Sequence, residues 1–175
     1  MPKLRKMLGE IDSQECIDLM RLLETQSATT LAKWAVSYAK ETYLPIYQTN
    51  GAAEDSCLDG VIANCEKYLA SEMKLAELKP SLKEAREFAA KVQGEVAQAA
   101  ARAVSTACAT IQTPTNALGY LFYGAAAVAY NEAGLEESAE VYDVLASKEL
   151  RKAWEVLKTV AVKKEPNPAK INWNC

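Results

Sequence analysis

Hydrophobic residues recur at spacings of three and four along most of the chain, which is the period of an amphipathic α-helix. The clearest stripe runs from Leu58 through Val61, Ile62 and Cys65 to Leu69. Runs of alternating Val, Ile and Thr, which would indicate strands, are nearly absent. The pattern predicts an all-α protein, and the length of 175 residues fits a single-domain helical bundle of about six or seven helices.

Prolines mark boundaries in the first half of the chain. Pro45 disfavours helical geometry in the residue before it, so the second helix should end near residue 44. Pro80 should lie in front of a long helix over residues 82–110. Gly94 should bend that helix, because a glycine in a helix interior costs about 1 kcal/mol relative to alanine.

The second half of the chain carries start and stop signals of the same kind. Thr113 can cap a helix and Pro114 suits its first turn, so a helix should open there. Gly134 should close it in a left-handed conformation. The last helix is expected over about residues 135–162.

These elements predict three regions. Residues 1–12 should be a flexible N-terminal lead-in, and residues 13–162 should form the helical domain. Residues 163–175 contain two prolines and should form an irregular C-terminal tail.

Composition narrows the function classes. Half of the residues are hydrophobic, which argues against disorder of the whole chain, and the net charge of −3 argues against a general nucleic-acid binder. The chain contains no histidine, so a Ser–His–Asp triad and a histidine-based zinc site are both excluded. We therefore expect no enzyme activity, no cofactor and no metal site.

The cysteines indicate a reducing compartment. Their number is odd and no Cys-x-x-Cys pair occurs, so we expect free thiols in the cytoplasm. The N-terminal residues lack the apolar segment of a signal peptide, which favours the same location. The cysteines are Cys16, Cys57, Cys65, Cys108 and Cys175.

A stretch without any charged residue extends over residues 103–131. Its longest apolar piece, residues 117–130, would be about 21 Å long as a helix, whereas a bilayer core measures about 30 Å. A buried core helix is therefore predicted, and no association with a membrane.

Two polar groups are candidate partner-binding residues. The segment TIQTPTN, residues 110–116, either caps the adjoining helices or forms a recognition surface through Gln112, Thr113, Thr115 and Asn116. Glu136, Glu140 and Asp143 are spaced to share one helical face, where they either form a solvated surface or steer a basic partner.

Two segments resemble a known family. LAKWAVSYAKETYLPIYQ, residues 31–48, and ARAVSTACATIQTPTNALGYLFYGAAAVAY, residues 101–130, are similar to the immunity-protein-five-like domains of bacterial polymorphic toxin systems. The family pattern has histidines in the polar turn, where this chain has Cys108 and Asn116. If those histidines bind metal or do chemistry, this chain lacks that capacity. Asn116 can replace a histidine that only forms hydrogen bonds.

The resemblance implies neutralisation of a cognate toxin by protein–protein binding, without enzyme activity. It leaves open whether the chain also forms a homo-oligomer. The alternative is a helical small-molecule-binding module with a pocket between the C-terminal helices, for which Thr113, Asn116 and Tyr120 would have to converge.

Overall fold

The protein's structure is a computed structural model that describes residues 3–51 and 55–174. The described residues contain eight helices, of which α2 and α3 are separated by Tyr43 alone. The all-α, single-domain fold is confirmed. The helices are α1 (Gln14–Leu23), α2 (Ala28–Thr42), α3 (Leu44–Asn50), α4 (Cys57–Leu69), α5 (Leu75–Lys91), α6 (Glu95–Ala109), α7 (Asn116–Ala133) and α8 (Ala139–Val160).

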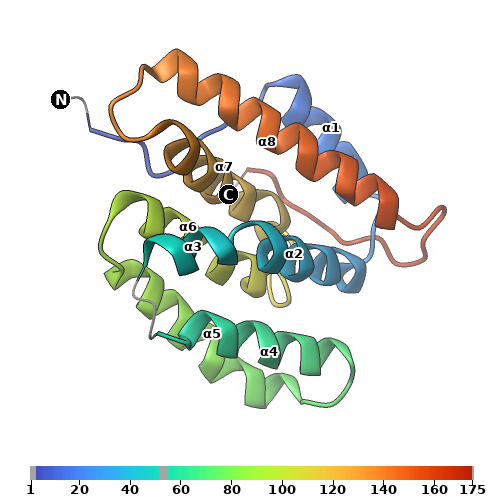
Figure 1. The fold of residues 1–175 in the computed structure, drawn as a ribbon. Coiled ribbons are helices and arrows are strands. Elements are labelled where there is room, and N and C mark those ends of the chain that lie inside the picture. The colour runs from blue at the N-terminus through green and yellow to red at the C-terminus, as the bar shows by residue number, and fades with distance from the viewer. Residues whose placement is uncertain (1–2, 52–54, 175) are drawn as a thin grey trace.

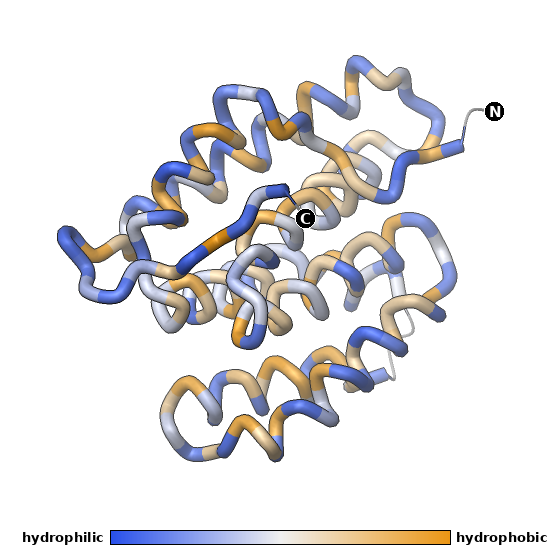
Figure 2. Tube along the Cα trace, turned by 180° about the vertical axis from the view of Figure 1, so that it is seen from behind, coloured by the Kyte–Doolittle hydropathy of each residue, from blue (hydrophilic) through white to orange (hydrophobic). Residues whose placement is uncertain are grey.

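The helices stack in three layers (Figure 1). Helices α1 and α8 form the upper layer, α4 and α5 form the lower hairpin, and α2, α3, α6 and α7 lie between them. The core runs through all three layers, because each helix turns its apolar stripe toward its neighbours. The amphipathic pattern can be followed in the lower hairpin, where hydrophobic and hydrophilic positions alternate along α4 and α5 (Figure 2).

The antiparallel pair α6 and α7 forms the centre of the fold and accounts for the uncharged stretch of the sequence. Small side chains on both helices let their backbones approach closely. No helix of the described residues could span a membrane. The fully buried alanines of the pair include Ala100, Ala103 and Ala107 on α6, and Ala125, Ala126 and Ala129 on α7.

The predicted start of the fourth helix is wrong, because Pro80 lies inside α5. The helix starts before it, at Leu75, where the N–H of Lys74 donates to the Glu77 carboxylate at 3.0 Å. Burial of Leu78, which is fully covered, anchors this first turn. Packing therefore outweighs the roughly 3 kcal/mol that a proline costs inside a helix.

Two further differences concern helix breaks. Gly94 has a φ of 92°, and the expected bend is a complete interruption between α5 and α6. Pro45 ends α2 as predicted but also lies in the first turn of α3, which the sequence did not indicate. Burial of Leu44 and Tyr47 holds α3 against the core.

The last helix begins later than predicted, at Ala139. Ser138 caps it, because its hydroxyl accepts from the N–H of Val141 at 3.3 Å. Gly134 ends α7 with a φ of 81°, which confirms the positive φ expected there. The Tyr142 hydroxyl donates to the Gly134 carbonyl at 2.6 Å and accepts from the N–H of Glu137 at 3.0 Å, so residues 134–138 form a fixed turn.

The segments at both ends of the described chain lie on the helices. The N–H of Leu8, a buried residue, donates to the Phe122 carbonyl at 3.1 Å. The tail turns back after α8 (Figure 2), and the Glu165 carboxylate accepts from the N–H of Ser27 at 2.8 Å and from its hydroxyl at 2.7 Å. The Trp173 indole N–H donates to Glu24.

The described cysteines are free thiols, as predicted. Cys16, Cys65 and Cys108 are buried, and Cys57 is half-buried. A hydrogen bond to Cys65, together with burial, raises the pKa of the Cys108 thiol. Cys175 lies outside the described residues.

Candidate partner-binding face

Helix α2 presents a narrow polar ridge to solvent between two grooves. The exposed side chains of the ridge are Lys33, Ser37, Lys40 and Glu41. Their spacing places them on one side of the helix, opposite the side that enters the core. We call this ridge, together with the grooves on either side of it, the α2 face.

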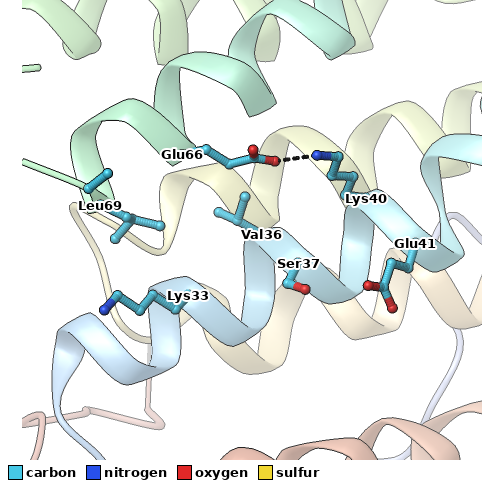
Figure 3. Close-up of a pocket in the computed structure, with 8 residues that line it drawn as sticks. Lys33, Val36, Ser37, Lys40, Glu41, Glu66 and Leu69 are labelled. Atoms are coloured by element: carbon cyan, nitrogen blue, oxygen red, sulfur yellow. Dashed lines mark hydrogen bonds and ion pairs between the residues drawn. The ribbon is translucent and has the colours of Figure 1, made fainter. Parts of the chain in front are cut away.

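The first groove lies between α2 and α4 and has a volume of about 650 Å³. Figure 3 shows Val36 of α2 and Leu69 of α4 among the residues that line it, and Lys40 reaching from α2 toward Glu66 of α4. The Lys40 ammonium donates to the Glu66 carboxylate across the groove at 2.7 Å. This hydrogen bond to the Glu66 carboxylate raises the pKa of Lys40 above its ordinary value.

The second groove lies between α2 and α8 and has a volume of about 450 Å³. Trp34 and Tyr38 of α2 line it, and Val156 and Val160 of α8 face them. Val160 and Val162 at its end are each 48% exposed, so the groove ends in apolar surface that is open to solvent. The groove is thus apolar inside, and Lys33 and Glu41 lie on its rim.

A buried carboxylate lies beneath the second groove. Glu149 of α8 is 4% exposed, and its Oε2 accepts from the hydroxyls of Tyr38 at 2.7 Å and Tyr43 at 2.8 Å. Burial raises the pKa of Glu149, although the two hydrogen bonds act in the opposite direction. The cluster ties α2 to α8 and fixes Tyr38 at the groove.

Aromatic rings extend this cluster into the core. Tyr120 of α7 packs edge-on against Trp34 at 5.4 Å and against Tyr43 at 6.1 Å between ring centroids. The Trp34 indole N–H and the Tyr120 hydroxyl are buried without a hydrogen-bond partner in the described structure. The rings of Trp34, Tyr43 and Tyr120 therefore belong to the core.

The polar turn does not cap helices through its side chains, which corrects that interpretation. Backbone hydrogen bonds form the turn, among them the N–H of Asn116 to the Thr113 carbonyl at 3.0 Å. Thr115 stands at the N-cap of α7 without a side-chain hydrogen bond, and the buried Thr110 hydroxyl has no partner among the described residues. Gln112 and Thr113 are exposed, whereas Thr115 and Asn116 are half-buried.

The acidic candidates do not share one helical face. Glu136 lies before the Ser138 cap, so only Glu140 and Asp143 belong to α8. All three acids are exposed, and Asp143 pairs with Arg5 at 2.6 Å. The acids and the polar turn lie at opposite ends of α7, a helix of 18 residues that is about 27 Å long.

The three residues of the alternative ligand pocket lie in different surroundings. Thr113 is exposed, Tyr120 is fully buried among aromatic rings, and Asn116 lines a pocket beside α5 and α6. The described residues also contain no group of three or more acidic or cysteine side chains that could hold a metal ion.

Sequence reasoning missed the α2 face. The spacing of Lys33, Ser37, Lys40 and Glu41 indicates an exposed helix side, and this signal was available. Whether the neighbouring helices close over such a side or leave grooves depends on how they pack, which the sequence pattern of α2 does not contain.

Comparisons with known proteins assign the family. Residues 21–158 match the family model described as Imm-5 like putative immunity protein. The matched segment covers well over half of the chain and contains the ridge of the α2 face and the polar turn. The curated proteins and the solved structures give no match. The chain therefore belongs to the Imm-5 like immunity-protein family.

Proposed function

We propose that this protein neutralises a cognate bacterial toxin by binding it directly, without catalysing a reaction. Family membership carries the proposal, because an immunity protein implies a toxin partner. A rigid inhibitor of this kind needs a surface that is complementary to the toxin and that covers its active site or another required surface. The proposed site of action is the cytoplasm.

The α2 face is our candidate for that surface. Protein interfaces combine an apolar centre with a polar rim, and this face has apolar grooves edged by Lys33, Lys40 and Glu41. A partner that inserts apolar side chains beside Val160 and Val162 would bury surface that is half exposed in the free protein.

The groove between α2 and α8 suits an amphipathic helix of the toxin. Such a helix would place its apolar side on Val156 and Val160. An acidic residue would meet Lys33, and a basic residue about two turns further along would meet Glu41. This charge order gives the orientation in which the helix would bind.

Ser37→Arg is expected to weaken binding of the cognate toxin, sought among the products of genes beside the gene for this protein, by about 100-fold. Ser37 lines both grooves, so a long charged side chain there obstructs each of them. The residue is exposed, and the substitution should change the free energy of unfolding by less than about 0.5 kcal/mol. Isothermal titration calorimetry with an inactive toxin variant measures the affinity.

Thr113→Arg is the matched control, because it places the same side chain on the polar turn. Loss of binding with Thr113→Arg but not with Ser37→Arg would move the contact to Gln112, Thr113, Thr115 and Asn116. If the unmodified protein neither binds that toxin nor protects cells from it, the proposed function is wrong.

We also propose that Glu136, Glu140 and Asp143 steer a basic toxin toward the protein. Replacing all three with alanine should slow association about 10-fold at low salt and much less at about 0.15 M salt, where screening is strong. Stopped-flow fluorescence measures the association rate. The control replaces Glu72, Glu84 and Glu87, exposed acids elsewhere, and so changes the net charge equally. Equal slowing by both variants would show a net-charge effect without a local patch.

A further inference from the structure

The pocket that Asn116 lines beside α5 and α6 carries polar side chains whose arrangement the proposed function does not explain. It lies between α5, α6 and the first residue of α7, and it has a volume of about 280 Å³. Its polar lining consists of Lys83, Arg86, Ser105, Thr106 and Asn116. This size is close to the lower end of the range for small-molecule sites, about 300–1,000 Å³.

The buried member of this group is Ser105 on α6. Its side chain lines the pocket and is only 7% exposed. Within the described part of the chain its side chain forms no hydrogen bond, and the same holds for the side chains of Thr106 and Asn116. The Ser105 hydroxyl is not sealed in the core, as the unpartnered Thr110 and Tyr120 hydroxyls are, and it is therefore open to the pocket. A hydroxyl that opens into a pocket and has no protein partner is available to hydrogen-bond a ligand or solvent there.

The cationic members come from one side of α5. Lys83 and Arg86 are three residues apart, which places both side chains on the same face of the helix. Arg86 has no ion pair among the residues that the structure describes, and Lys83 has only a weak exposed contact to Glu87 at 4.0 Å. Two positive charges therefore border the pocket, and only one of them has even a weak acidic partner.

We propose that this pocket binds a small phosphate-bearing anion. A guanidinium and an ammonium match the charge of a phosphate dianion, and arginine can donate two parallel hydrogen bonds to phosphate oxygens. The hydroxyls of Ser105 and Thr106 and the side-chain amide of Asn116 supply further donors. Three or more oxygens of the phosphate could therefore accept hydrogen bonds. The site lies away from the α2 face, and its test does not depend on the toxin.

Inorganic phosphate is the probe. Titration of the full chain, followed by ¹H–¹⁵N NMR at constant ionic strength with sodium chloride as the balancing salt, should give saturable shifts at Ser105, Thr106 and Asn116. Arg86→Gln and Ser105→Ala should each weaken binding about 10-fold or more. Lys91→Gln removes an exposed cation from the same helix but outside the pocket, and it should bind like the unmodified protein.

The outcomes separate the proposal from general charge screening. Shifts that do not saturate, or that are equal in Arg86→Gln and the unmodified protein, would overturn it. Saturable binding of succinate without binding of phosphate would overturn the phosphate assignment and show a carboxylate site. Ser105→Ala removes a hydroxyl that has no protein partner, so the folded state should be retained and the test remains interpretable.

Discussion

Gly124→Ala is expected to lower the free energy of unfolding by roughly 3 kcal/mol, or to prevent folding. A Cβ atom at this position of α7 would lie 2.0 Å from Cζ of Tyr43 and 2.4 Å from its hydroxyl oxygen. Tyr43 is fully buried, and its ring packs against Tyr38 and Tyr120. The ring cannot move aside without losing its hydrogen bond to Glu149, so the clash is not relieved. Urea unfolding followed by circular dichroism measures the effect.

Gly119→Ala is the control on the same helix. A Cβ atom there would meet nothing closer than the Asn116 Oδ1 at 4.0 Å. Alanine should therefore raise the free energy of unfolding by up to about 1 kcal/mol through its helix propensity. If both variants had the same stability, the close contact between Gly124 and Tyr43 would not exist in solution.

Glu149→Ala is expected to cost roughly 3–5 kcal/mol of folding stability. It leaves the hydroxyls of Tyr38 and Tyr43 without their acceptor and creates a cavity between α2 and α8. Glu149→Gln retains an oxygen that can accept from both hydroxyls, so its stability at pH 7 should equal or exceed that of the unmodified protein. Urea unfolding at pH 7 compares the variants.

The pH dependence of stability tests the buried charge directly. Burial raises the pKa of Glu149 above its ordinary value of 4.5. Between pH 4.5 and the raised pKa the folded protein holds a proton that the unfolded chain has released, so the contribution of Glu149 to stability falls as pH rises through this window. The stability of the unmodified protein minus that of Glu149→Gln should therefore decrease as pH rises from about 4 to 7.

A second carboxylate on α8 provides the control for the pH experiment. Glu155 is exposed, and among the described residues its side chain forms only an ion pair with Lys158 at 3.0 Å. Glu155→Gln should leave the pH dependence close to that of the unmodified protein. Identical pH profiles for Glu149→Gln and the unmodified protein would contradict the raised pKa.

The helical class could be predicted because its signals are local. The stripe from Leu58 to Leu69 repeats with the period of a helix, and α4 covers the residues that it marks. Gly134 takes the positive φ that its place after α7 suggests. These signals depend on neighbours along the chain, which the sequence shows directly.

Pro80 shows where local signals were insufficient. Its geometry predicted a helix start, yet the stripe of Leu75, Leu78 and Leu82 continues across it with helical spacing. Burial of Leu78 outweighs the cost of a proline inside the helix, and this burial depends on the helices packed around α5. A local rule thus gave the wrong boundary, because a tertiary contact outweighed it.

The sequence by itself determined an all-α chain, its buried alanine-rich centre and its membership of an immunity-protein family. Tertiary structure alone decided that Glu149, in a segment of charged residues, is buried under Tyr38 and Tyr43, and that α2 lies between two grooves. The physical reason is the distance along the sequence between the residues that make each kind of contact. Helix periodicity arises from contacts three and four residues apart, whereas grooves and buried carboxylates arise where distant helices meet or diverge.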